Sequence, residues 1–493
     1  MTLGQRIRSG VAWVMFGETG SHVLQFLFGI ALARLLVPAD FGMIATIQIL
    51  TGIAGIVSSG GMGQSLIRAR EASKEDFDVV FTLQFGVCLL ICAAIFAIAP
   101  WFARFFENPL YVPLLGISAL SFLLRPFAVV RSAWLTREMR FKGAATANLG
   151  TSVVIGFASV GMAFGGMGVW SLSLSGLLAA LTINLLLYRL CPLRLNLRLD
   201  ASTMRRHVTF GFNLTVLDLI SHFRMQIFNL ILSKLAGPAA LGLFNKGESL
   251  ARMPNRLITP ATGKVVFRAL SSVSDDLDQS KYILYRTITL LSVYIYPFLV
   301  ILIWVAEPLI LFLYGEKWLA AAAPARIIAI GSLILPALRP CSVLLQAQNR
   351  LRQEIVVSVI ALVVGAAGCF VGLRWGLVGV AWSVVLSQAL SFALLYAFAY
   401  RTISTRLSEL GQALAPALIL SALLWISLAA LHWFIAELAQ RTPFAYLAAM
   451  GAVGGAVYGG AFLFLPMKTL EGEVARWRAR LSAARRKAKF WSH

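Results

Sequence analysis

The chain has 493 residues, of which 59% are hydrophobic and only 13% are charged. Soluble globular domains carry roughly 25% charged residues, so this composition excludes an ordinary soluble fold. The formal net charge of +22 would suit a nucleic-acid-binding protein only if the basic residues formed one soluble patch.

Apolar segments long enough to cross a bilayer follow one another from Val11 to Leu465. A spanning helix needs about 20 mostly apolar residues, so the sequence predicts an all-α integral membrane protein with about fourteen transmembrane helices. The first segment contains Glu18 and His22 and lacks a small-residue cleavage site, which favours a retained helix over a cleaved leader. The expected ranges are 11–36, 42–66, 79–103, 111–134, 146–165, 168–189, 210–235, 240–264, 284–312, 322–346, 354–374, 377–400, 411–435 and 443–466.

Lysine and arginine are unevenly distributed between alternate loops. With a cytoplasmic N-terminus, most of them fall in cytoplasmic loops and at the two chain ends, and few fall on the opposite side. Those few are Arg34, Arg104, Lys234, Lys317, Arg326, Arg374 and Arg441. The positive-inside rule therefore predicts that both termini of this multi-pass membrane protein lie in the cytoplasm.

The chain contains an internal repeat. Residues 31–43 recur without a gap at 231–243, so that Pro38 aligns with Pro238 and Gly42 with Gly242. The first six helices thus repeat as the next six in the same orientation, which is a parallel repeat. We expect an N-lobe over 1–190, a cytoplasmic linker over 191–209, a C-lobe over 210–401 and two further helices within 402–467. A basic cytoplasmic tail follows over 468–493, either as an amphipathic segment on the anionic leaflet or as a solvated tail.

Two predicted helices carry ionisable and amide side chains about one turn apart, which places them on one face of each helix. An ionisable group inside a bilayer costs several kcal/mol, so it normally faces a partner or a polar cavity. The pattern predicts either that both faces line one cavity near the midplane or that each carboxylate only bonds the histidine one turn away. These side chains are Glu18, His22 and Gln25 in the first helix and Asp218, His222 and Gln226 in the seventh.

Cationic side chains gather in the second half of the chain. Guanidinium stays charged when desolvated and offers two parallel donors to phosphate oxygens, so a buried cationic cluster indicates a phosphate ligand. The alternative is that some of these cations pair with Glu248 or Asp218. The predicted phosphate-contacting residues are Lys246, Arg252, Arg256, Arg224, Arg339 and Arg125.

We expect neither a metal nor a cofactor. No His/Cys group has zinc spacing. The Asp-x-Asp pairs at Asp76 and Asp276 lie in loops too short to fold a nucleotide-sugar domain.

Several segments resemble the Wzx-type polysaccharide transporters, in the colanic-acid-exporter-like branch of the multidrug/oligosaccharidyl-lipid/polysaccharide exporter superfamily. They are SGVAW at 9–13, LARLLVPADFG at 32–42, LTREMRF at 135–141, FRALSSVSDD at 267–276, LYGEKW at 313–318 and LLQAQNR at 344–350. The resemblance implies two six-helix lobes forming a V around a cavity, alternating access and two extra C-terminal helices. It also implies a cationic cavity for the pyrophosphate of an undecaprenyl carrier, although no short motif defines that site.

The resemblance implies a flippase that moves undecaprenyl-diphosphate-linked oligosaccharide from the cytoplasmic to the periplasmic leaflet, for exopolysaccharide, capsule or O-antigen. Its expected partners are the lipid-linked glycan, membrane lipids and other polysaccharide-assembly proteins, and no nucleic acid. The alternatives are a cation-coupled multidrug antiporter of the same superfamily and a membrane glycosyltransferase or polymerase. We expect no enzymatic activity, because the longest loops are too short for a catalytic domain.

Overall fold

The computed structural model describes residues 3–68, 73–273 and 275–491, and these residues form helices without any strand. The first unit of the chain contains α1 (Leu3–Leu35), α2 (Pro38–Ser59), α3 (Met62–Arg68), α4 (Lys74–Phe105), α5 (Tyr111–Arg137), α6 (Phe141–Phe164), α7 (Val169–Leu190) and the start of α8 (Ala201–Ser272). The second contains the rest of α8, α9 (Leu277–Tyr314), α10 (Ala322–Ser332), α11 (Leu335–Ala347), α12 (Leu351–Gly372), α13 (Gly376–Ile403), α14 (Leu407–Ile435), α15 (Leu438–Arg441), α16 (Pro443–Phe464) and α17 (Glu471–Trp491).

The predicted all-α membrane fold is confirmed. Within the described residues, ten helical stretches are long and apolar enough to cross a membrane, or eleven if the bent pair α10 and α11 forms one span. One of these stretches, Leu351–Ile403, contains both α12 and α13. The predicted range 42–66 covers both α2 and α3, which together form one candidate span, Pro38–Ile67. Each of the other ranges corresponds to a helix, to the bent pair or to one half of α8, which is interrupted at Gly237. The number fourteen stays a prediction.

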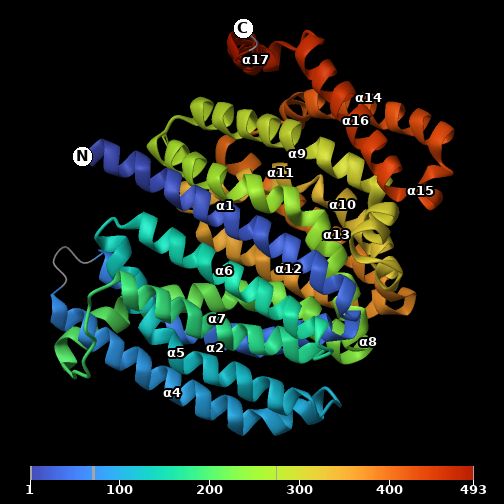
Figure 1. The fold of residues 1–493 in the computed structure, drawn as a ribbon. Coiled ribbons are helices and arrows are strands. Elements are labelled where there is room, and N and C mark those ends of the chain that lie inside the picture. Colours follow the sequence, from blue (N-terminus) through green and yellow to red (C-terminus); the bar gives the residue numbers. More distant parts are fainter. Residues whose placement is uncertain (1–2, 69–72, 274, 492–493) are drawn as a thin grey trace. The chain divides into compact units, whose positions relative to one another are not determined.

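The chain divides into two compact units, residues 1–242 and 243–493. In the first unit α4 packs beside α5, and α1 packs beside α6 (Figure 1). The apolar core there includes Ile47 of α2, Ile95 of α4 and Leu114 of α5. In the second unit α9 packs against α14 and α16, with Val293 and Met450 in their shared core. The assignment of the lobes to 1–190 and 210–401 stays a prediction.

Local sequence signals fix where helices begin and end. Pro38 begins α2, where its missing N–H is no loss. Gly60 ends α2 in the left-handed conformation, with φ of 49°. Ser73 caps α4: its hydroxyl accepts from the Asp76 N–H at 3.3 Å, and the Asp76 carboxylate accepts from the Ser73 N–H at 2.9 Å.

The two copies of the repeated Pro-x-x-x-Gly segment pack against each other inside the first unit. A Cβ added to Gly42 would lie 1.6 Å from the Pro238 carbonyl oxygen, and one added to Gly242 would lie 1.9 Å from the Pro38 oxygen. Only glycine permits two helix backbones to approach so closely. The reciprocal contact explains why both copies keep glycine at this position.

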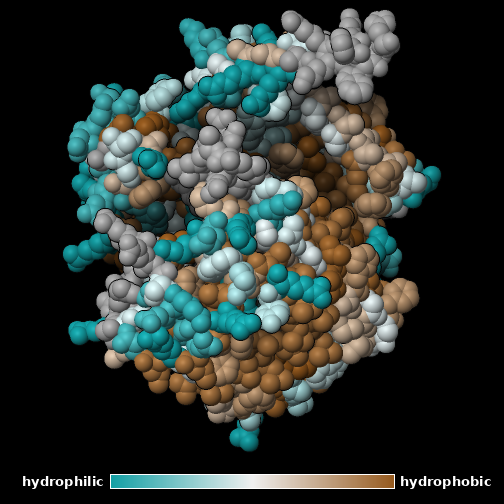
Figure 2. Space-filling view, turned by 60° about the vertical axis from the view of Figure 1, so that its left-hand side comes forward, coloured by the Kyte–Doolittle hydropathy of each residue, from teal (hydrophilic) through white to brown (hydrophobic). Residues whose placement is uncertain are grey.

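Large apolar side chains cover much of the surface. Phe157 is 69% exposed and Phe164 is 80% exposed, both on α6. On the face drawn in Figure 2, apolar side chains form a broad continuous area, and hydrophilic side chains gather along its borders. Such an area would be unfavourable in water but is expected of a surface that contacts lipid.

Candidate functional site

The first unit contains a cavity of about 360 Å³ between α2, α5 and α8. Successive turns of α2 supply most of its lining, α5 supplies one residue and α8 supplies two. The lining residues are Gln48, Thr51, Gly52, Gly55, Ile56, Ser59, Arg125, His222 and Gln226. Three of the residues predicted from the sequence, Arg125, His222 and Gln226, are therefore brought together here.

Arg125 is the cation of this cavity. It lies near the middle of α5, roughly 20 Å from either end of the helix at 1.5 Å per residue. Since the hydrocarbon core of a bilayer is about 30 Å thick, this position is close to the midplane. The guanidinium carbon lies 5.8 Å from the centre of the Phe122 ring, and no ion pair joins Arg125 to a described carboxylate.

Two glycines of α2 make room for the functional side chains. A Cβ on Gly55 would lie 2.8 Å from Arg125 Nη1, and a Cβ on Gly52 would lie 2.2 Å from His222 Cε1. Both distances are shorter than a normal contact of about 3.5 Å. The glycines are thus what allows a guanidinium and an imidazole to sit against the α2 backbone.

Hydrogen bonds orient the groups contributed by α8. His222 Nε2 lies 3.3 Å from the Ile49 carbonyl oxygen. The Gln226 side-chain oxygen accepts from Asn229 Nδ2 at 2.7 Å. On α2, the Thr51 hydroxyl donates to the Ile47 carbonyl and the Ser59 hydroxyl donates to the Gly55 carbonyl. The polar lining is therefore held by neighbouring backbone and amide groups.

The charge balance of the cavity favours an anion. Its lining includes one guanidinium, one imidazole and neutral polar groups, and none of the residues that line it is a carboxylate. At low dielectric such a site attracts negative charge and disfavours a cationic ligand. A phosphate could accept from the guanidinium through two oxygens and from the glutamine amides.

The other residues predicted on the first unit lie outside this cavity. Glu18, His22 and Gln25 are exposed along α1, and Asp218 is exposed on α8. None of the four lines the cavity. That these residues line a polar cavity stays a prediction. Arg224 lies in α8, and its side chain is outside the described part of the structure.

The cations of the second unit are engaged in different ways. Arg252 Nε lies 2.7 Å from Glu248 Oε1, and both side chains are about one quarter exposed. With the Gln388 amide turned so that its oxygen faces Arg252, that oxygen accepts from Nη2 at 2.7 Å. The Lys246 ammonium lies 4.6 Å from the Tyr314 ring centre and 5.5 Å from that of Trp318.

The remaining two cations of the predicted phosphate set are exposed. They are Arg256 on α8 and Arg339 on α11. The predicted pairing of a cation with Glu248 is found for Arg252.

Sequence reasoning missed the α2 contribution to the cavity. Gln48, Thr51 and Ser59 are uncharged, so the cost of burying charge did not single them out. Gly52 and Gly55 carried a signal, because glycine within a spanning helix often marks a close approach. The chain has 40 glycines, however, and the signal does not separate these two from the others.

Comparison with known proteins identifies the family. A family model described as "Polysaccharide biosynthesis protein" matches residues 31–324. The chain belongs to this family. The resemblance inferred from the sequence segments is thereby confirmed.

Two proteins of known name align with this chain over most of their length. The lipopolysaccharide biosynthesis protein WzxC of Escherichia coli is 21% identical over 356 residues, which are 71% of this chain and 72% of WzxC. The succinoglycan biosynthesis transport protein ExoT of Rhizobium meliloti is 23% identical over 336 residues, 68% of this chain and 67% of ExoT.

Solved structures show the same fold. The lipid II flippase MurJ in an inward closed conformation matches with a TM-score of 0.70 and 14% identity, over 90% of this chain and 96% of that one. An inward-facing multidrug resistance MATE family transporter matches with a TM-score of 0.61 and 13% identity, over 77% of this chain and 94% of that one. The transporter fold expected from the sequence is confirmed.

Proposed function

We propose that this family member is a flippase that moves an undecaprenyl-diphosphate-linked oligosaccharide from the cytoplasmic to the periplasmic leaflet of a bacterial inner membrane. The observation that carries the proposal is Arg125, a cation near mid-membrane in a polar cavity whose lining includes no carboxylate. The similar proteins WzxC and ExoT are named for lipopolysaccharide biosynthesis and succinoglycan transport, which supports a glycan as the cargo.

The chemistry of the cavity supports recognition of the diphosphate. An arginine held at low dielectric costs free energy unless an anion or a strong acceptor compensates it. A diphosphate supplies that compensation and leaves the isoprenoid tail in lipid. The sugars would meet the amides and hydroxyls of α2 and α8, such as Gln48, Thr51 and Gln226. No covalent step is required, so we propose a transporter and not an enzyme.

The distribution of lysine and arginine supports the proposed topology. Both termini would lie in the cytoplasm, and the cytoplasmic loops would face the anionic leaflet. We propose Arg252, Arg256 and Lys246 as further diphosphate contacts during the transport cycle. Glu18, His22, Asp218 and His222 would shape the path or couple it to an ion. Other polysaccharide-assembly proteins would supply and consume the cargo.

The cavity argues against the alternative of a cation-coupled multidrug antiporter. Such a transporter would use a membrane-embedded carboxylate to bind its cationic cargo or coupling ion. The residues that line this cavity supply a cation instead.

Substitution of Arg125 tests the proposal. A deletion strain is complemented with wild type, Arg125→Ala, Arg125→Lys or Arg104→Ala, and surface polysaccharide, glycan-loaded lipid carrier and protein abundance are measured. Hydrogen bonds to charged groups contribute about 1.5–3 kcal/mol, so Arg125→Ala should lower export roughly 10- to 100-fold while loaded carrier accumulates. Export by Arg125→Lys should lie between that of wild type and that of Arg125→Ala, because lysine keeps the positive charge but lacks the two parallel N–H donors of the guanidinium.

Arg104→Ala is the matched control, because it removes an exposed arginine at the end of α4. It should export like wild type. Normal export by Arg125→Ala at normal abundance would refute the assigned role of the cavity. Unchanged export with altered susceptibility to cationic drugs would favour the antiporter. The same assay applied to Arg252→Ala and Arg256→Ala examines the second set of contacts.

A further inference from the structure

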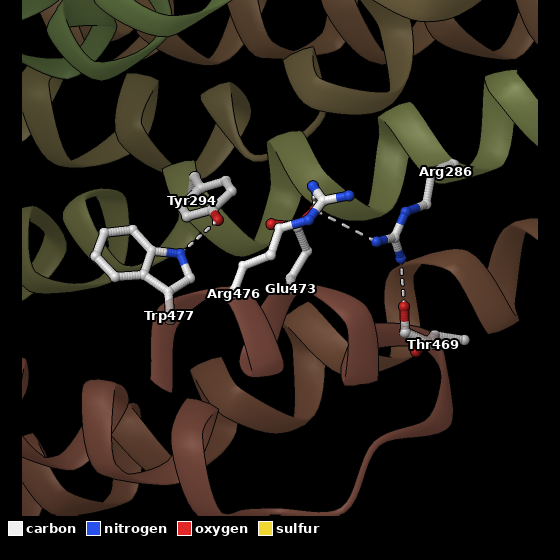
Figure 3. A network of polar contacts seen from close by, with 6 residues as sticks. All are labelled: Arg286, Tyr294, Thr469, Glu473, Arg476 and Trp477. Carbon is white, nitrogen blue, oxygen red and sulfur yellow. Dashed lines mark hydrogen bonds and ion pairs between the residues drawn. The ribbon is translucent and has the colours of Figure 1, made fainter. Parts of the chain in front are cut away.

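The C-terminal helix α17 is held against α9 by a set of polar contacts. Trp477 Nε1 donates to the Tyr294 hydroxyl at 3.0 Å, and Arg286 Nη2 lies 3.5 Å from Glu473 Oε1 (Figure 3). Arg286 also donates to the Thr469 carbonyl in the turn before α17. Figure 3 shows these side chains reaching toward each other from the two helices. The start of the basic tail is therefore docked on a spanning helix and not solvated on all sides.

Beside these contacts lies an apolar groove of about 330 Å³, formed by α9, α16 and Trp477 of α17. Its lining includes Tyr294, Pro297 and Phe298 of α9 and Tyr458 and Gly459 of α16. The polar atoms of the lining are engaged: the Tyr458 hydroxyl donates to the Val293 carbonyl at 2.7 Å, and the Tyr294 hydroxyl accepts from the indole. The groove thus presents hydrocarbon and ring surfaces, with Phe298 57% exposed.

Two arginines of α17 contact residues that line the groove. Arg478 Nη2 donates to the carbonyl of Leu463, a lining residue, and the Arg480 guanidinium lies 5.7 Å from the Trp477 ring centre. A carbonyl and an indole are neutral groups, so they do not neutralise the positive charges of Arg478 and Arg480. Arg286 and Arg476 differ, because both lie within 3.5 Å of the Glu473 carboxylate, which neutralises part of their charge.

We propose that this groove binds one acyl chain of an anionic bilayer phospholipid, with its phosphate on Arg478 and Arg480. The groove is at the lower end of the roughly 300–1,000 Å³ of small-molecule sites, which suits one hydrocarbon chain. Tyrosine and tryptophan side chains favour the membrane interface, where an acyl chain meets its headgroup. Juxtamembrane arginines attract anionic lipid, so charge complementarity favours phospholipid over a neutral apolar partner. The bound lipid would fasten α17 to α9 and α16.

Filling the groove tests the proposal. Gly459 lines it, and a Cβ at this position would meet no atom within 4 Å, so Gly459→Leu should fold and occupy the space. Gly451→Leu is the control on the same helix, because its Cβ is equally unobstructed and it does not line the groove. Full-length protein is placed in nanodiscs of equal phosphatidylglycerol and phosphatidylcholine, and retained lipid is counted by native mass spectrometry.

Wild type and Gly451→Leu should retain one more phosphatidylglycerol per chain than Gly459→Leu. Wild type should prefer phosphatidylglycerol over phosphatidylcholine about tenfold, and Arg478→Gln with Arg480→Gln should reduce that preference to about threefold or less. Equal retention by wild type and Gly459→Leu would overturn the proposal. Displacement of phosphatidylglycerol by equimolar undecaprenyl phosphate would also overturn it and assign the groove to the carrier tail.

Size-exclusion elution of each variant separates a lost site from a misfolded chain. If Gly459→Leu does not elute as the folded protein, the preference of Arg478→Gln/Arg480→Gln for phosphatidylglycerol over phosphatidylcholine tests the proposal. An unchanged preference would then overturn it. These arginines lie outside the Arg125 cavity, so failure of this proposal would leave the proposed transport function untouched.

Discussion

Substituting Gly52 by alanine should deform the candidate site without changing its charge. The added Cβ would lie 2.2 Å from His222 Cε1 and 2.7 Å from Nε2. Normal carbon contacts are about 3.5 Å, so the ring must retreat by more than about 1 Å. That movement breaks its 3.3 Å contact with the Ile49 carbonyl. Overpacking costs about 1–3 kcal/mol and alanine regains about 0.5–1 kcal/mol of helix preference, so mid-range values leave a net loss of about 1 kcal/mol.

The assay pairs thermal unfolding of the purified protein in detergent with export in the complemented deletion strain. Gly86→Ala is the control, because its Cβ would meet no atom within 4 Å on α4. It should be neutral or slightly stabilising. Combining Gly52→Ala with His222→Ala removes the clash, so the double variant should recover about 1–2 kcal/mol relative to additivity. Wild-type stability and export of Gly52→Ala alone would refute the steric argument.

Two further predictions concern contacts within the first unit. Gly42→Ala places a Cβ 1.6 Å from the Pro238 backbone oxygen, which cannot move as a side chain can, so we expect little folded protein by size-exclusion chromatography; a normal yield would contradict the close crossing. The Lys234 ammonium lies 2.7 Å from the Glu107 carboxylate and holds the pKa of that carboxyl below its usual value. The ion pair therefore stabilises the fold fully above pH about 4.3, the usual pKa of glutamate. This stabilisation is lost as the pH falls through the lowered pKa. Lys234→Met should therefore lower the unfolding temperature slightly at pH 7 and leave it unchanged well below pH 4, whereas a pH-independent difference would argue against the pair.

The membrane fold was predictable because it depends on amino-acid composition and on the length and spacing of the apolar stretches. Twenty-residue apolar stretches specify spanning helices whatever their partners, since hydrocarbon leaves no other way to satisfy the backbone. Even the interruption of α8 was visible, because two predicted spans, 210–235 and 240–264, leave Gly237 between them. The bend of 50° between α10 and α11 was not predicted, and the sequence placed one continuous span there.

The candidate site was predictable only in part. The cost of burying polar groups singled out Arg125, His222 and Gln226, and the structure places all three at one cavity. The same reasoning singled out Glu18 and His22, which are exposed on α1 and do not line it. Helical spacing fixes which side chains share a face of one helix, but the helix that this face meets depends on packing between distant segments. The spacing of residues in one sequence does not show which helices pack against each other.

Arg252 and Arg125, two of the proposed diphosphate contacts, differ in how the protein balances their charge. Arg252 has Glu248 at 2.7 Å, so its charge is balanced without any cargo. Arg125 lies near mid-membrane with an aromatic ring and neutral polar groups around it, and the fold gains little from keeping it there. An unbalanced charge in such a place lowers stability. Under the proposed function, an anion in the cavity would balance this charge, and Gly55 leaves the guanidinium room to reach that anion.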